Sequence, residues 1–351
     1  MCIKKNFSIA LTVVFLLLVS SAATLSFSAE EGGNPVYAAN GDVSKLFDAK
    51  TFQTDSGYTL PYRIYIPYNY DSSKAYPLVL FLHGAGERGN DNVSQLKNGI
   101  GQPFKKEQSP IYQCIVVAPQ CPSGKKWVNV KAWTENQYST DQIAESDELK
   151  AVVELLFAIE QDYSVDTDRI YATGLSMGGY GTWDLLVRHG DLFAAGIPVC
   201  GGCDVSKAEL LTDIPIRTYH GGRDTTVPPT GTEAMVNAIK QAGGTKINYT
   251  CYDKLGHSIW NNVYAIGDLF SWLLAQKLSD RLPEHNQSTD TGTLQDTDPP
   301  SDPDTEANTS TQRKGCTGII KGAPVIFLTA TICPVLLHAR YKPPHFKKRK
   351  I

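Results

Sequence analysis

A serine set between glycines is the feature of this sequence that most directly suggests chemistry. The segment Gly174-Leu175-Ser176-Met177-Gly178 follows a strand-like run, Arg169–Thr173, and precedes a helix-like stretch. A strand that turns sharply into a helix holds a serine exposed, and glycines remove the Cβ atoms that would clash there. The first N–H groups of the helix favour negative charge. We therefore predict that Ser176 is a nucleophile, the alternative being a glycine-rich turn without chemistry.

A serine hydroxyl needs a base before it can attack, and histidine commonly serves. His257 follows the strand-like run Ile247–Tyr252, so it lies in a loop after a strand. Between Ser176 and residue 281 the other histidines are His189, in the last turn of the helix after the serine, and His220. We predict that His257 is the base and that His220 structures the loop that follows it.

The base in turn needs an acid that orients it. Asp224 ends the segment His220-Gly221-Gly222-Arg223-Asp224, which follows the strand-like run Ile216–Tyr219. Sheets of parallel strands place their sites beyond the carboxyl ends of the strands. We predict that Asp224 is the acid, with Asp253 and Asp204 as the alternatives.

Acyl transfer also requires donors for the negatively charged oxygen that develops on the carbonyl. The segment His83-Gly84-Ala85-Gly86 directly follows the apolar run Leu78–Leu82. We predict that the N–H groups of Met177 and Ala85 form this oxyanion hole, with Gly86 as the alternative to Ala85.

Strand-like runs alternate with helical patterns over residues 41–280, which form one unit. Leu78–Leu82 is continuously apolar, as in a parallel strand buried on both faces. Helical spacing occurs at Leu149–Ile159, Thr232–Ala242 and Val263–Lys277. The pattern predicts an α/β fold with a mainly parallel sheet and helices on both faces.

Residues from about Leu60 to Gln276 resemble the α/β-hydrolase superfamily. Within it they resemble secreted bacterial carboxylesterases of the predicted-peptidase or phospholipase/carboxylesterase type, which are similar to feruloyl and acetyl carbohydrate esterases and polyhydroxybutyrate depolymerases. The resemblance implies an α/β-hydrolase fold with the triad Ser176, Asp224 and His257. It rests on Phe81-Leu82-His83-Gly84-Ala85-Gly86-Glu87-Arg88-Gly89, Gly174-Leu175-Ser176-Met177-Gly178-Gly179-Tyr180-Gly181-Thr182-Trp183, His220-Gly221-Gly222-Arg223-Asp224 and Gly256-His257.

The longest stretch between predicted elements, Pro119–Asp147, leaves room for little or no lid. It contains Trp127 and Trp133, which either bind substrate by stacking on sugar or phenolic rings or pack the loop onto the domain. A shallow site suits acetyl or feruloyl groups on polysaccharide better than long-chain lipid.

Charge and cysteine content exclude other kinds of site. The net charge is −3, and basic residues dominate only the last segment, so we expect no nucleic-acid partner. Cys200-Gly201-Gly202-Cys203 lacks the second pair that a zinc site would need. We expect a loop disulfide or two free thiols there, and neither a metal nor an organic cofactor.

The two ends of the chain carry targeting signals. Lys4 and Lys5 precede the apolar run Ile9–Val19, which predicts a secretory signal peptide over residues 1–29, the alternative being a membrane anchor. Residues 281–315 are rich in Thr, Ser, Asp and Pro and read as a disordered tether.

Residues 316–351 begin with a mostly apolar stretch and end in a basic tail. This pattern predicts a C-terminal membrane anchor with its tail in the cytoplasm, the alternative being a peripheral or disordered basic tail. The expected location is therefore extracellular, at the cell surface.

Together these features predict a surface-held serine esterase that hydrolyses carboxylic esters. Two other classes remain open. One is a serine peptidase of the prolyl-oligopeptidase type, although no propeller-sized domain precedes the catalytic unit. The other is a non-catalytic binding module on a hydrolase scaffold.

Overall fold

The computed structural model describes residues 42–281. The predicted signal peptide (1–29), the predicted tether beyond Arg281 and the predicted C-terminal anchor (316–351) lie outside the described residues. Within residues 42–281, no helix combines the length and the hydropathy that crossing a bilayer requires.

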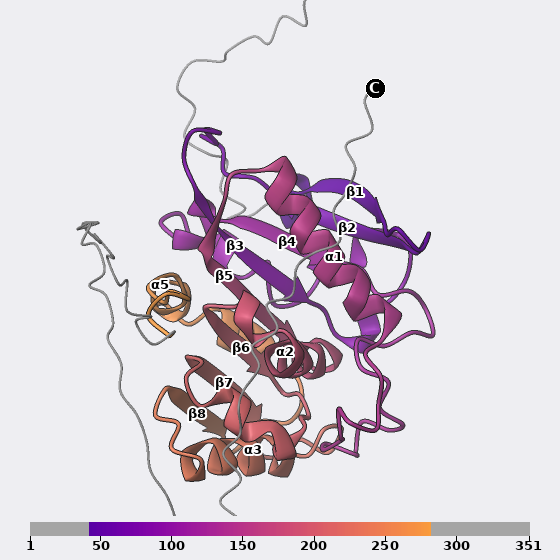
Figure 1. Ribbon diagram of the computed structural model, residues 1–351, viewed down its shortest axis with the longest axis vertical. Helices are drawn as coiled ribbons and strands as arrows, with labels where there is room; N and C mark the ends of the chain where they lie inside the picture. Colours follow the sequence, from indigo (N-terminus) through magenta and orange to yellow (C-terminus); the bar gives the residue numbers. More distant parts are fainter. Residues whose placement is uncertain (1–41, 282–351) are drawn as a thin grey trace, which may run out of the picture. The chain divides into compact units, whose positions relative to one another are not determined.

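Eight strands form one sheet in the order β1-β2-β4-β3-β5-β6-β7-β8 (Figure 1). The pairs β1–β2 and β2–β4 are antiparallel, and the other pairs are parallel. The mainly parallel sheet predicted from the sequence is therefore confirmed. The strands are β1 Asp48–Gln53, β2 Thr59–Tyr65, β3 Tyr76–Leu82, β4 Ile115–Pro119, β5 Val165–Leu175, β6 Ala195–Val199, β7 Ile216–Gly221 and β8 Ile247–Tyr252.

Helices cover both faces of the sheet, so the core is divided into two buried clusters. Three helices belong to the cluster on one face, and two shorter helices belong to the cluster on the other. Short 3-10 turns occupy several of the connections. The helices are α1 Asp147–Asp162, α2 Met177–Arg188, α3 Thr230–Gln241, α4 Trp260–Tyr264 and α5 Leu269–Leu274.

Strand β3 shows why the sheet is buried on both sides. Successive side chains of a strand point to opposite faces. Leu80 and Leu82 therefore join the cluster with α1 to α3, whereas Val79 and Phe81 join the cluster with α4 and α5. All four are fully buried, which is why this run is apolar without interruption.

Two parts of the sheet and one helix differ from the sequence expectation. Strands β1 and β6 were not predicted, and β6 contains Pro198 although it lies between β5 and β7. The helix expected over Val263–Lys277 is divided into α4 and α5 by a segment that contains Gly267. Glycine weakens a helix interior because it has the most backbone freedom to lose.

Candidate active site

The carboxyl ends of β5, β7 and β8 bring Ser176, Asp224 and His257 together. The His257 Nε2 atom lies 2.8 Å from Ser176 Oγ, and the His257 Nδ1 atom lies 2.6 Å from Asp224 Oδ2. Because a carboxylate only accepts, Nδ1 carries the proton, which leaves Nε2 free to accept from the serine hydroxyl. This arrangement can transfer a proton away from Ser176 as its oxygen attacks.

Ser176 has an unusual backbone conformation at the turn between β5 and α2. Its φ is +53° and its ψ is −116°, a region that non-glycine residues rarely occupy. The turn is possible because the residues two positions before and after Ser176 are glycines, which have no Cβ atoms. A Cβ on Gly178 would lie 1.9 Å from the Leu82 oxygen, and one on Gly174 would lie 2.4 Å from the Gly178 oxygen.

Gly178→Ala is expected to remove at least about 3 kcal/mol from the free energy of unfolding, because the new methyl group would overlap a backbone carbonyl that cannot move aside. Urea unfolding of the full chain measures the loss. Gly267→Ala is the matched control, since nothing lies within 4 Å of its Cβ position. Equal stability of the two variants would contradict this account of the turn.

The Asp224 carboxylate is buried and fully hydrogen-bonded. Its Oδ1 atom accepts the N–H groups of Thr226 and Val227, both at 2.9 Å. Burial alone would raise the pKa of Asp224, but hydrogen bonds from His220, His257 and the Val227 N–H outweigh burial and hold the pKa below its usual range. The group is therefore an anion at neutral pH, as an acid that stabilises an imidazolium must be.

The alternative acids lie elsewhere. Asp204 caps the 3-10 turn Val205–Leu211, where its carboxylate accepts from Ser206 and Thr140. Asp253 is exposed. Of these aspartates, only Asp224 has a hydrogen bond to His257 among the described residues.

The other histidines have partners of their own. His189 lies at the end of α2, where its Nε2 atom is 2.8 Å from Glu145 Oε1. His220 is fully buried beside Asp224, with its Nε2 atom 3.2 Å from the Asp224 Oδ2 atom. His220 lies in β7 and contacts the acid of the loop that it was expected to structure, although the sequence did not indicate a direct contact with Asp224.

The residues predicted for the oxyanion hole begin two helical segments. Ala85 opens the 3-10 turn Ala85–Glu87, and Met177 opens α2. An N–H at the first position of a helix has no carbonyl partner within that helix. The loop also lies close to the serine, since a Cβ on Gly84 would be 3.6 Å from the Ser176 Cβ.

Side chains hold the carbonyl groups of this loop. His83 Nδ1 lies 2.6 Å from the Gly84 oxygen, and Arg88 Nε donates to the Ala85 oxygen at 2.8 Å. Trp127 Nε1 donates to the His83 oxygen at 3.1 Å. With its carbonyls fixed in this way, the loop holds its N–H groups in a constant position, as electrostatic catalysis requires.

His83 is expected to make the stability of the protein depend on pH. Its Nε2 atom accepts the Cys121 N–H at 2.9 Å, and burial lowers the pKa of His83 to about 4 from 6.5. The unfolded chain therefore binds a proton below pH 6.5 that the folded chain binds only near pH 4. Stability is present in full above pH 6.5 and falls between pH 6.5 and 4, by about 3 kcal/mol in all.

Urea unfolding at pH 7 and pH 4.5 checks this expectation. His83→Gln keeps an acceptor for the Cys121 N–H but cannot take up a proton, so it is expected to lose less stability than the wild type over the same interval. Equal losses in the two proteins would contradict the assignment.

Of the two tryptophans expected to bind substrate, Trp127 is not available for that role. Its side chain is fully buried, and its ring packs against His83 with the ring centroids 5.3 Å apart. The alternative that Trp127 packs the loop onto the domain is therefore the one observed. Burial of the indole is favourable because its N–H group has a hydrogen-bond partner. Trp133 is only partly buried, beside Tyr180 and under the Lys126 ammonium group.

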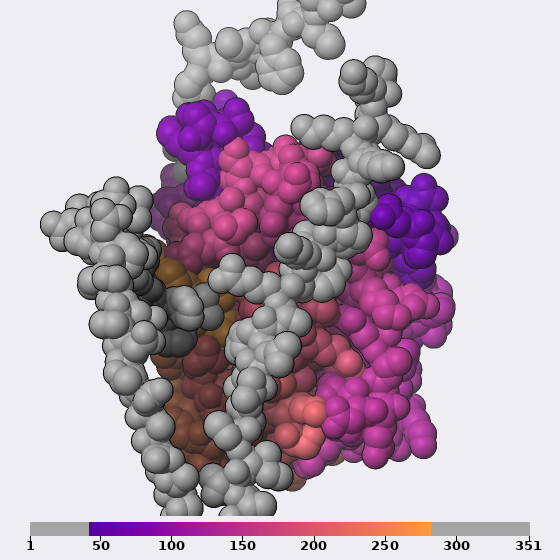
Figure 2. Space-filling view, in the orientation of Figure 1, coloured from indigo at the N-terminus to yellow at the C-terminus, as the bar shows by residue number. Residues whose placement is uncertain are grey.

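Residues 120–146 form no helix or strand and lie at the lower right of the face in Figure 2. They are attached to α2 by polar contacts. Tyr138 donates to Asp184 at 3.0 Å, and Arg188 donates to the Ile143 oxygen at 2.6 Å. These contacts fasten the segment to the helix that begins at Met177.

Trp260 is a neighbour of His257 that the sequence did not indicate. Its ring meets the His257 ring edge to face, with centroids 5.4 Å apart. The short separation in sequence could have indicated this contact, because Trp260 starts α4 only three residues after His257. The contact restricts the rotation of the imidazole.

The cysteines of the described domain are all free thiols: Cys114, Cys121, Cys200, Cys203 and Cys251. The alternative of a Cys200–Cys203 disulfide is therefore not observed. Ligand-type atoms of Cys200, His220 and Asp224 lie within 4.8 Å of one another. Each already has a protein partner, including the His257 oxygen for the Cys200 thiol, so hydrogen bonding accounts for the cluster.

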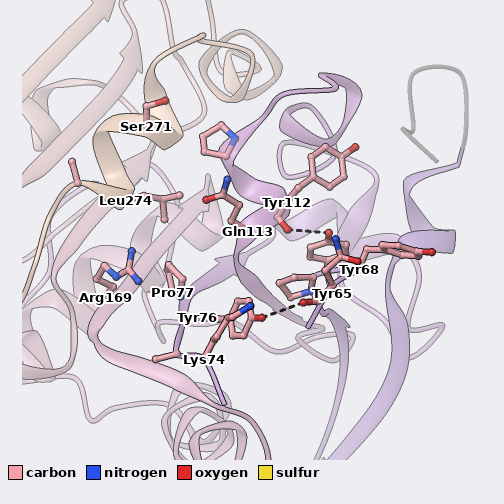
Figure 3. Close-up of a pocket in the computed structure, with 15 residues that line it drawn as sticks. Tyr65, Tyr68, Lys74, Tyr76, Pro77, Tyr112, Gln113, Arg169, Ser271 and Leu274 are labelled. Atoms are coloured by element: carbon pink, nitrogen blue, oxygen red, sulfur yellow. Dashed lines mark hydrogen bonds between the residues drawn. The ribbon is translucent and has the colours of Figure 1, made fainter. Parts of the chain in front are cut away.

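A cavity of about 710 Å³ lies near the amino ends of the central strands β3 and β5 (Figure 3). Tyr76 at the start of β3 and Arg169 on β5 line it, together with Leu274 from α5. Six residues of β5 separate Arg169 from Ser176, so the cavity is about 20 Å from Ser176. It is not part of the triad site.

Comparisons with known proteins show the family to which the chain belongs. The family model for phospholipases and carboxylesterases matches residues 69–267. A probable feruloyl esterase C from Aspergillus terreus is 30% identical over 184 residues, which are 52% of this chain and 62% of that protein. A bifunctional acetylxylan esterase/xylanase from Neocallimastix patriciarum is 25% identical over 219 residues, 62% of this chain and 29% of that protein.

Among solved structures, a thermostable esterase is 36% identical with a TM-score of 0.60, over 67% of this chain and 64% of that chain. This chain thus spans less than two thirds of each of these proteins. The family match nevertheless covers more than half of the sequence and includes Ser176, Asp224 and His257. It confirms the resemblance drawn from the motifs, and the chain belongs to the phospholipase/carboxylesterase family of α/β-hydrolases.

Proposed function

We propose that this protein is a serine esterase that hydrolyses carboxylic esters. The unbroken line of hydrogen bonds from Asp224 through His257 to Ser176 carries the proposal. Nucleophile, base and acid stand in the order and geometry that acyl transfer needs. Membership of a carboxylesterase family supports the same reaction.

The reaction proceeds in two steps. His257 takes the Ser176 proton as the serine oxygen attacks the ester carbonyl, and the N–H groups of Met177 and Ala85 stabilise the oxyanion. His257 then gives its proton to the departing alcohol, which leaves an acyl group on Ser176. In the second step His257 activates a water molecule, which releases the acid and restores the serine. Asp224 stabilises the imidazolium in both steps.

The substrate class that we propose is acetyl or feruloyl ester on polysaccharide. The names of the relatives include a feruloyl esterase and an acetylxylan esterase, which supports these acyl groups. The attachment of residues 120–146 to α2 supports a short acyl group, because a fastened segment does not act as the mobile apolar lid that a long chain would use. Trp133, the partly buried tryptophan, is the proposed aromatic contact for the substrate.

We expect the full chain to hydrolyse p-nitrophenyl acetate and methyl ferulate with a kcat/KM at least about 10-fold higher than that for p-nitrophenyl palmitate. The reason is that a site without a mobile apolar lid leaves the methylene groups of a long acyl chain without contacts, and each such contact contributes to transition-state binding. Steady-state kinetics on the three esters and on a peptide p-nitroanilide measure the preference. Equal turnover of acetate and palmitate would contradict the substrate class, and faster amide than ester hydrolysis would favour a peptidase.

The place of action that we propose is the cell surface. The apolar run Ile9–Val19 after two lysines supports export, and the apolar stretch followed by a basic tail in residues 316–351 supports attachment. Cell fractionation with N-terminal sequencing of the mature chain tests both. An uncleaved protein in the soluble cell fraction would contradict the proposal.

A further inference from the structure

Two histidines meet on one oxygen of the catalytic acid. The Asp224 Oδ2 atom lies 2.6 Å from His257 Nδ1 and 3.2 Å from His220 Nε2. His257 is partly exposed, whereas the His220 and Asp224 side chains are completely buried. In the mechanism above His257 has a role and His220 has none, although the two rings contact the same carboxylate.

The surroundings of His220 fix which of its nitrogens carries the proton. Its Nε2 atom lies 2.9 Å from the Val227 carbonyl oxygen, which can only accept a hydrogen bond. Nε2 is therefore protonated: it donates to the Val227 oxygen, and Asp224 Oδ2 lies 3.2 Å from the same nitrogen. The Nδ1 atom lies 2.9 Å from the Thr232 hydroxyl on α3, which fixes the plane of the ring.

These contacts link His220 to the loop that carries Asp224. The Val227 oxygen accepts from His220, and the Val227 N–H donates to Asp224 Oδ1 at 2.9 Å. His220 thus contacts Asp224 directly and also through the residue that holds its other oxygen. A buried ring with both nitrogens engaged restricts the carboxylate to one orientation.

The second donor also changes the charge that His257 experiences. A carboxylate that interacts with two N–H donors attracts the proton of each donor less strongly than a carboxylate that interacts with a single donor. The titratable groups around Asp224 are His220 from β7, Cys200 after β6, Tyr180 on α2 and His257 itself. Of these, the two histidines hydrogen-bond to the carboxylate.

We propose that His220 is a positioning residue of the esterase reaction: through its Nε2–H it holds Asp224 in the orientation that aligns His257 and limits the pull of the carboxylate on the His257 proton. This inference rests on the proposed function and adds a residue to its machinery. It predicts that the position of a single N–H donor at residue 220 controls turnover.

His220→Gln and His220→Asn form a matched pair, because glutamine places an amide nitrogen near the Nε2 position and asparagine places one near Nδ1. We expect His220→Asn to lower kcat for p-nitrophenyl acetate by about 10- to 100-fold with little change in KM. The acidic limb of its kcat/KM profile is expected to move to higher pH, because Asp224 then holds the His257 proton more tightly. His220→Gln is expected to recover most of the lost kcat and the wild-type profile.

Rates are expressed per active site, counted by stoichiometric labelling of Ser176 with a fluorophosphonate, so that misfolded protein does not enter the comparison. His189→Gln serves as the control for loss of a histidine outside the site. Unchanged kcat in His220→Asn, or equal losses in both variants with an unmoved pH profile, would overturn the positioning role. A wild-type chain that neither reacts with the fluorophosphonate nor hydrolyses the ester would instead overturn the proposed function, and the role of His220 with it.

Discussion

Ser176→Ala is expected to lower kcat for p-nitrophenyl acetate by at least about 10⁴-fold. The alanine removes the oxygen that forms the acyl intermediate, and no neighbouring hydroxyl can take its place on the strained turn with φ +53°. The oxyanion donors remain, so a small residual rate above the uncatalysed reaction is expected. Initial rates of the purified full-length protein measure the change.

The variant is also expected to fold normally. Alanine keeps the Cβ atom, and the Ser176 N–H still donates to the Val199 oxygen at 2.8 Å. Ser73→Ala is the control, because this serine is exposed in the segment before the start of β3, and the substitution is expected to leave kcat unchanged. Equal rates for Ser176→Ala and the wild type would remove Ser176 from the mechanism.

Asp224→Asn is expected to lower kcat by about 10³- to 10⁴-fold while KM changes little. An asparagine amide can present an N–H to His257 Nδ1, which would then accept and leave the proton on Nε2. In that tautomer the imidazole cannot take the Ser176 proton. A pH profile of kcat adds a second readout, because the neutral amide no longer favours a proton on His257 and the acidic limb is expected to move to lower pH.

The alternative aspartates supply matched controls for this substitution. Asp253→Asn is expected to leave kcat unchanged, because its side chain is exposed. Asp204→Asn removes a charge that caps the turn Val205–Leu211, so a loss of stability without a loss of kcat is expected. A drop in kcat for Asp253→Asn as large as that for Asp224→Asn would reassign the acid.

Much of the fold could be predicted from the sequence because the decisive signals are local. The apolar run Leu78–Leu82 identifies a strand buried on both faces, and Ser146 with the acidic residues after it marks the start of α1. Strand β6 could not be recognised in this way, since Ala-Gly-Ile-Pro-Val lacks a strand composition. Its place in the sheet comes from its neighbours β5 and β7, which tertiary packing supplies.

The substrate contacts show the limit of the same reasoning. Trp127 and Trp133 lie on one loop and look equivalent in the sequence. Only the fold reveals that Trp127 is fully buried and donates to the His83 oxygen, whereas Trp133 keeps part of its ring exposed. Burial depends on which distant segment covers a side chain, and that information is not local.

The type and the order of the chemical groups could be predicted from the chain alone: a serine on a glycine turn, an aspartate and a histidine each after a strand, and a glycine-rich loop before them. These follow from steric and topological rules that act over a few residues. The pairing of Asp224 with His257, and the second contact of Asp224 with His220, become visible only in the folded protein. Hydrogen bonds between separate loops depend on distances of a few tenths of an ångström, which only the packed sheet and its helices fix.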